Sequence, residues 1–87
     1  CDLVFATSTS SAIAERMRIN TSGHVYPGAD NTQDLGSAAK RWRNIYTTDL
    51  HLANERGNWT VIEEEDYLTL RNNKTNKVYK LVMEEIE

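Results

Sequence analysis

Short runs of alternating apolar and polar residues predict a β-rich protein. Residues 2–8, DLVFATS, contain Val and Phe and predict a first strand. Residues 15–20 alternate charged and apolar side chains, which is the period of a half-buried strand whose apolar side chains face inward. The small polar residues of 20–23 then predict a turn, from which residues 24–26 return as a partner strand.

The second half of the chain has the same character. Residues 46–52 are rich in β-forming side chains and predict a strand, and a turn and a further strand over 59–62 follow. The strongest hairpin pattern comes last, where residues 67–71 and 77–83 flank the polar loop 72–76. The second strand of this hairpin is apolar on both faces, so it needs cover on both sides, more than a monomer of this length can supply.

One segment has the period of a helix instead of the alternation of a strand. Apolar residues between 35 and 46 recur at steps of three and four, which places them on one helical face. Gly36 interrupts the preceding chain, and the Ser37 hydroxyl is suited to cap a first turn, so we predict one short helix near residues 37–44. So short a helix is unstable alone because nucleation costs more than its few hydrogen bonds return. We therefore expect its apolar stripe to pack on another surface.

The length and composition make a self-sufficient core difficult. Hydrophobic residues make up 39% of the 87 positions, and a domain of this size buries only about two-thirds of the surface that its unfolded chain exposes. The single cysteine, Cys1, excludes an internal disulfide, and His24 and His51 lack the spacing of metal ligands. A lone histidine on a strand is more often simply packed or exposed than bound to a metal. A metal shared by these histidines on a threefold axis is therefore also disfavoured. Oligomerisation is then the expected route to sufficient burial.

Several classes of function do not fit the composition. The net charge is −3 and most of the basic residues are scattered, which argues against nucleic-acid binding. No stretch approaches the roughly 18 apolar residues of a membrane span. No pair of acids is arranged as in a glycosidase, so we expect neither an enzyme nor a cofactor. Since the chain begins with cysteine instead of methionine, we interpret it as a piece of a longer protein, with Cys1 at the boundary or serving as a labelling handle.

Two ordered motifs resemble segments of bacteriophage tail-fibre and tail-spike proteins. Residues 15–25, ERMRI followed by TSGHV, are similar to a segment near the C-terminal end of those proteins, and residues 34–46, DLGS followed by RWRNIY, are similar to a second one. The resemblance implies an intertwined homotrimeric fibre-type domain in the virion, outside the cell. It also implies contacts with other tail proteins and with a host cell-surface glycan or protein. The self-cleaving chaperone domain of many relatives is not expected, because the residues from Trp59 onward show no Ser/His or Ser/Lys arrangement.

We therefore predict a mainly β protein of two parts, a fibre-type segment over residues 1–57 and a C-terminal β-hairpin cap or trimerisation element over residues 58–87. The mechanism expected is burial of apolar side chains between chains, with strand pairing that covers exposed edges. Receptor-binding residues stay unassigned. The residues expected in the trimer interface or core are Met17, Ile19, Leu35, Trp42, Ile45, Tyr46, Leu50, Leu52, Val78 and Leu81.

Other hypotheses compete with this one. In the first, the loops 54–58 and 72–76 recognise a host receptor or glycan. In the second, the chain is a non-viral β-rich oligomerisation domain whose motifs match by chance. Aromatic side chains such as Trp59 are able to stack on sugars, but large rings more often fill a core or a seam between chains. The acidic run 63–66 lacks the spaced ligands and the glycine of a calcium loop, which favours a solvated acidic patch.

Overall fold

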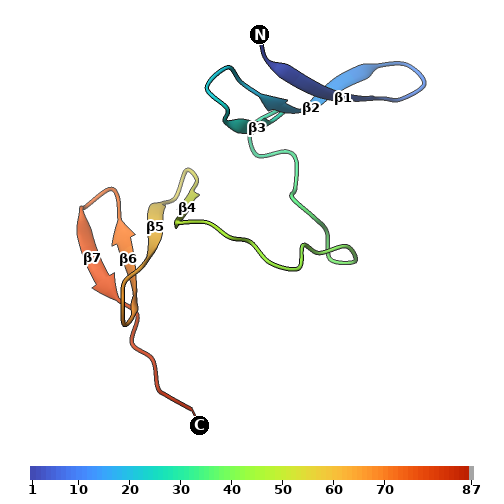
Figure 1. Ribbon diagram of the computed structural model, residues 1–87. Helices are drawn as coiled ribbons and strands as arrows, with labels where there is room; N and C mark the ends of the chain where they lie inside the picture. The colour runs from blue at the N-terminus through green and yellow to red at the C-terminus, as the bar shows by residue number, and fades with distance from the viewer. Residues whose placement is uncertain (87) are drawn as a thin grey trace. The chain divides into compact units, whose positions relative to one another are not determined.

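The computed structural model describes residues 1–86 as two antiparallel β-sheets (Figure 1). Glu87, the last residue of the predicted cap, lies outside the described residues. The chain divides into two units, Cys1–Arg43 and Asn44–Glu87, with one sheet in each. The prediction of a mainly β protein is confirmed, while the predicted functional boundary between residues 57 and 58 stays a prediction.

The first unit holds a three-stranded sheet in which β2 is central. Its turn between the second and third strands forms where the sequence predicts it. The Asn20 side-chain oxygen accepts hydrogen bonds from the amides of Ser22 and His24, both at 3.0 Å, and Gly23 has a φ of 89° that favours glycine. The three strands are β1 (Leu3–Ser8), β2 (Ile13–Ile19) and β3 (Val25–Pro27).

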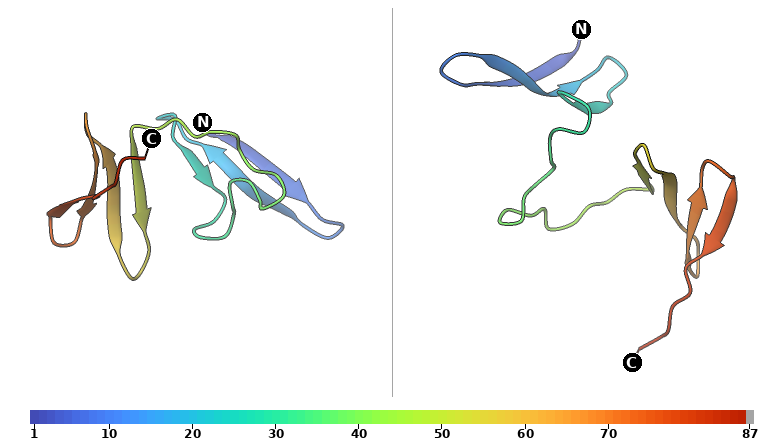
Figure 2. Two further views of the ribbon diagram at one scale, coloured as in Figure 1. Left: turned by 90° about the horizontal axis from the view of Figure 1, so that it is seen from below. Right: turned by 180° about the vertical axis from the view of Figure 1, so that it is seen from behind.

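The second unit holds a four-stranded meander whose strands lie side by side in chain order, as Figure 2 shows from two further directions. The predicted loop 72–76 closes the last hairpin, and Asn76 takes a left-handed φ of 62° there. The strand predicted at 46–52 begins later, and the one predicted at 77–83 ends earlier. The four strands are β4 (Asp49–Ala53), β5 (Asn58–Glu63), β6 (Leu68–Asn72) and β7 (Lys77–Lys80).

The predicted helix near residues 37–44 is wrong. The capping contact itself is present, since the Lys40 amide donates to the Ser37 hydroxyl at 2.9 Å. However, the Ser37 amide donates forward to the Lys40 carbonyl at 2.9 Å, whereas a helical amide donates backward to a carbonyl four residues earlier. The segment is therefore an isolated turn, and residues 28–48 form one long connection without strand or helix.

Neither sheet encloses an apolar core in residues 1–86. No hydrophobic residue of this part of the chain is buried, and the buried residues are Thr60 and Thr69. The chain exposes 8283 Å², whereas two separate compact units of about 5 kDa each would together expose about 6,300 Å². A single copy thus leaves about 2,000 Å² more surface in water than compact units of this mass do.

Candidate interaction surface

The four-stranded sheet has one almost wholly apolar face. Residues paired across antiparallel strands lie on the same face, and the face alternates along each strand. The row Leu50, Val61, Leu70 and Tyr79 crosses all four strands, and the next positions along the strands extend it. We call this surface the C-terminal apolar face; its members are Leu50, Leu52, Trp59, Val61, Leu68, Leu70, Tyr79 and Leu81.

This face is open in the single chain. Leu50 is 47% exposed, Leu52 54% and Tyr79 49%. The Trp59 and Tyr79 rings make a tilted contact with their centroids 5.9 Å apart, so they form one aromatic surface instead of two separate rings. Monomeric soluble proteins rarely leave an apolar patch of this kind uncovered, which makes the face a candidate contact surface.

The opposite face of the same sheet is polar and internally bonded. Its central row is His51, Thr60, Arg71 and Val78. Thr60 is only 4% exposed, and its hydroxyl lies 2.9 Å both from His51 Nδ1 and from the Asn73 side-chain nitrogen, which donates to it. Because these polar groups satisfy one another, this face needs no partner to remain stable in water.

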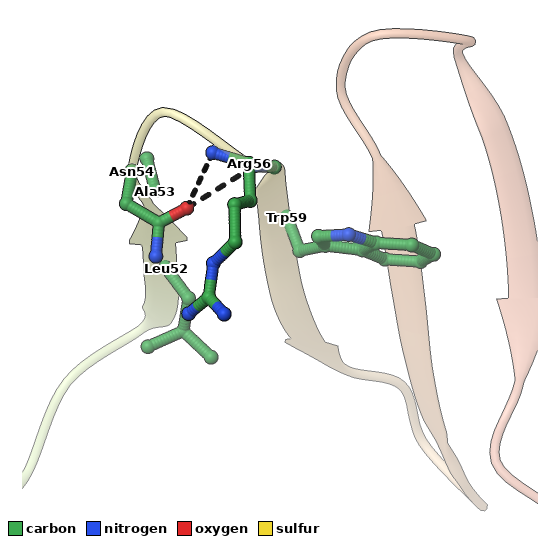
Figure 3. A pocket seen from close by; sticks show the side chains of 6 residues that line it. Leu52, Ala53, Asn54, Arg56 and Trp59 are labelled. Carbon is green, nitrogen blue, oxygen red and sulfur yellow. Dashed lines mark hydrogen bonds between the residues drawn. The ribbon is translucent and has the colours of Figure 1, made fainter.

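A hollow of about 310 Å³ lies at the end of the C-terminal apolar face, beside the turn between β4 and β5 (Figure 3). Leu52 and Trp59 line it, with Arg56 extending from the turn. The turn is held by the Asn54 side-chain oxygen, which accepts from the amides of Arg56 at 2.8 Å and Gly57 at 3.2 Å. An indole and a guanidinium that line the same hollow suit a ring with a polar or anionic substituent.

The three-stranded sheet has an apolar face of its own, which we call the N-terminal apolar face. The pairing places Leu3 opposite Ile19 and Phe5 opposite Met17, and β3 extends both rows. Met17 also helps to line a hollow of about 280 Å³ together with Leu35 from the long connection. The members of this face are Leu3, Phe5, Met17, Ile19, Val25 and Pro27.

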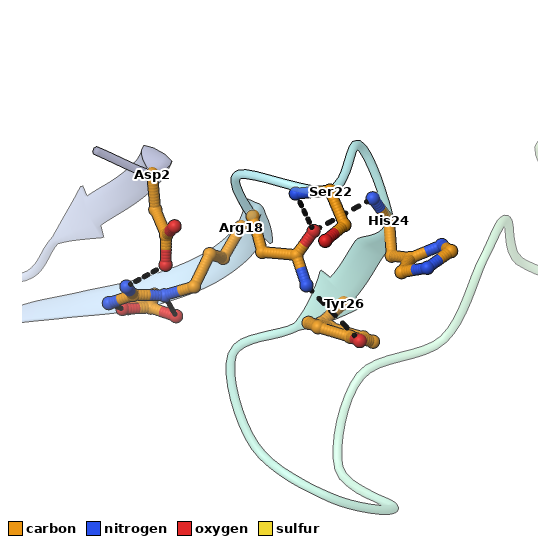
Figure 4. A network of polar contacts seen from close by, with 7 residues as sticks. Asp2, Arg18, Ser22, His24 and Tyr26 are labelled. Carbon is orange, nitrogen blue, oxygen red and sulfur yellow. Dashed lines mark hydrogen bonds and ion pairs between the residues drawn. The ribbon is translucent and has the colours of Figure 1, made fainter.

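Ion pairs occupy the other side of this sheet (Figure 4). The Arg18 guanidinium donates to the carboxylates of Asp2 at 2.7 Å and Glu15 at 2.6 Å. The hydrogen bond from Arg18 holds the pKa of Glu15 below its usual value of 4.5. The same bond, together with the one that Arg18 donates to Asp2, raises the pKa of Arg18. This cluster ties the start of β1 to β2 and has the character of a structural ion pair.

The residues expected in the trimer interface fall into four groups. Met17 and Ile19 share the N-terminal apolar face, and Leu50, Leu52 and Leu81 share the C-terminal apolar face. Val78 lies on the opposite, polar face and is 58% exposed. The long connection carries the remaining four, all exposed: Leu35, Trp42, Ile45 and Tyr46.

Sequence reasoning missed the centre of the C-terminal apolar face. The missed residues lie in β5 and β6, so their common side follows only when the pairing of the strands is known. Both hairpin turns were recognisable in the sequence, and counting outward from them would have aligned the strands. The missed members are Val61, Leu68 and Leu70, while Trp59 and Tyr79 were expected among the large rings that fill a core or a seam between chains, without a face assigned to them.

The other candidate chemistry is sparse. Among residues 1–86, no three His, Cys, Asp or Glu side chains lie close enough together to hold a metal ion. The acidic run 63–66 leads into a turn in which the Glu64 amide donates to the Tyr67 carbonyl, and the Glu64 carboxylate accepts from the Thr69 hydroxyl at 3.3 Å. No helix in the described residues is long and apolar enough to cross a membrane.

The comparisons with known proteins give no match: no family model, no curated protein and no solved structure is similar to the chain.

Proposed function

We propose that the chain is a structural module of a virion, the C-terminal trimeric part of a phage tail fibre that supports fibre assembly and host attachment. The observation that carries the oligomeric part is that no hydrophobic residue within residues 1–86 is buried in a single copy. The occurrence of both motifs in order along the chain, ERMRI and then DLGS, supports the assignment to a tail fibre. No catalytic role is part of this proposal.

The surface area supports assembly quantitatively. A single copy exposes about 2,000 Å² more than two compact units of its mass. A standard protein interface buries about 800 Å² on each partner, and obligate assemblies bury more. The excess is therefore of the size that an obligate oligomer removes from water. A trimer of this kind folds as it assembles, so its stability rises with concentration.

A receptor- or glycan-binding tip is a second candidate function. The hollow beside the β4–β5 turn favours it, because Arg56 of the turn and Trp59 of β5 line a concave surface that the sheet supports. The ligand suited to it is a host-surface sugar, held by the indole face and the guanidinium.

The test combines the mass of the native assembly with a binding screen. Light scattering after size exclusion is expected to give about three times the 10.0 kDa chain mass. A glycan array and adsorption to bacterial cells then separate the two candidates. An intact trimer without binding leaves the structural role alone, and a trimer that binds a sugar supports the tip function. A stable monomer would contradict both tail-fibre functions and favour a chance match of the motifs.

A further inference from the structure

We propose that the C-terminal apolar face is the contact between copies of this chain, and that the polar face of the same sheet stays in solvent. This inference rests on the proposed oligomer and specifies the surface that forms it. The occupant of the face is the same face of the other copies, packed around the symmetry axis of the assembly.

The distribution of charge on the face fits a contact between identical copies. Its central row, from Leu50 through Val61 and Leu70 to Tyr79, carries no charged residue. The charged residues on this side of the sheet stand at its ends, Glu63 beside Leu68 and Lys77 beside Asn72. An apolar centre with a charged rim is the usual anatomy of an interface, and identical copies meet there without repulsion between like charges.

The edge of the sheet formed by β7 favours a face contact over lateral pairing. The outer strand β7 begins with Lys77 and ends with Lys80, and lysines on an edge strand disfavour pairing with another chain. The polar face is also unsuited to a dry contact. Its threonine and histidine groups are already bonded to one another, and Arg71 would have to lose its water. The apolar face is the remaining broad surface of this sheet.

The exposed area agrees with this occupant. The excess exposure of a single copy, summed over both units and the long connection, is about 2,000 Å², more than twice the share that each partner buries in a standard interface. A small ligand in the hollow beside Trp59 would cover only one end of the face. A second copy presents an apolar surface of equal extent.

Two adjacent residues of β7 provide a matched test in the full-length chain. Tyr79 lies on the C-terminal apolar face and Val78 on the polar face, and their exposures in a single copy are similar at 49% and 58%. We expect Tyr79→Glu to raise the dissociation constant of the assembly by about 100-fold or more, because it buries an unpaired charge. Val78→Glu adds the same charge in solvent and should leave the assembly mass unchanged.

Hydroxyl-radical footprinting of the unmodified chain keeps the inference testable if Tyr79→Glu fails to fold. Oxidation of Trp59 and Tyr79 should slow several-fold as the concentration rises through assembly, while that of Tyr26, on the ion-paired side of the three-stranded sheet, serves as an internal reference. Assembly without protection of Trp59 and Tyr79, or loss of assembly in Val78→Glu with retention in Tyr79→Glu, would overturn the inference but leave the oligomer standing. A chain that stays monomeric at every concentration would overturn both this inference and the proposed function.

Discussion

Replacing Trp59 with alanine is expected to weaken assembly far more than it weakens the lone chain. In a single copy the indole is half-buried and its one aromatic partner is Tyr79, 5.9 Å away between centroids. Such a pair contributes about 0.5–1.5 kcal/mol beyond its buried area. When the area that the half-buried ring already buries is added, the substitution should cost a single copy about 2 kcal/mol.

The cost in the assembly is larger because the ring is then covered from both sides. Removal of a fully buried tryptophan costs about 3–5 kcal/mol. Subtracting the cost to the lone chain leaves about 1–3 kcal/mol of lost association free energy per copy. Three copies lose about 3–9 kcal/mol together, which raises the dissociation constant of a trimer by at least about 100-fold.

Sedimentation equilibrium over a dilution series measures this change directly. Trp59→Phe is the matched control, since it keeps an aromatic ring against Tyr79 and should recover most of the affinity. Circular dichroism reports whether the sheets persist in each variant. An alanine variant that assembles as tightly as the original chain would refute the burial of Trp59 between copies.

Three further perturbations test particular contacts. Gly28→Ala would place a Cβ in steric overlap with the backbone carbonyl of Glu15 and should cost about 2–3 kcal/mol of the free energy of unfolding in urea. Gly23→Ala, whose Cβ meets open space at a positive φ, should cost about 1 kcal/mol. Thr60→Val removes the hydroxyl that bonds to His51 and Asn73 and should lower the free energy of unfolding by about 1–3 kcal/mol. An unchanged free energy of unfolding would show that water replaces the hydroxyl. The hydrogen bond from Arg18 lowers the pKa of Glu15 in the folded chain, so ionised Glu15 stabilises the first unit at pH values above its usual pKa of 4.5. This stability is lost as the pH falls through the lowered pKa. Glu15→Gln should flatten that acid limb in thermal unfolding between about pH 3 and pH 6, and an unchanged limb would assign it to another carboxylate.

The strands were largely predictable because their alternation and their turns are local in the sequence. The turn at residues 20–23 contains Asn and Gly, and the loop at residues 72–76 contains Asn, Lys and Thr. Each lies between flanking β-formers, and both form. The helix was not predictable in the same way. Its apolar spacing was correct for a helix, but over so few residues the spacing does not determine the backbone, and the turn at Ser37 closes in the other direction.

The candidate site was only partly predictable for a different reason. Leu50 and Leu52 were recognisable as apolar residues of one strand, but Leu70 and Tyr79 join them only through pairing across the sheet. The same pairing places Val78 on the other face of the sheet. The sequence of β7 is apolar on both sides and therefore predicts that both sides are covered by other residues. The structure shows that the side of Val78 belongs to the face that carries the polar network around Thr60.

The concentration dependence of thermal unfolding tests the central claim most directly. If other copies supply the apolar core that a single chain lacks, the unfolding midpoint must rise with protein concentration, and the native mass must be about three times 10.0 kDa. A sharp transition at a temperature that does not change with concentration, from a species of 10.0 kDa, would contradict the account.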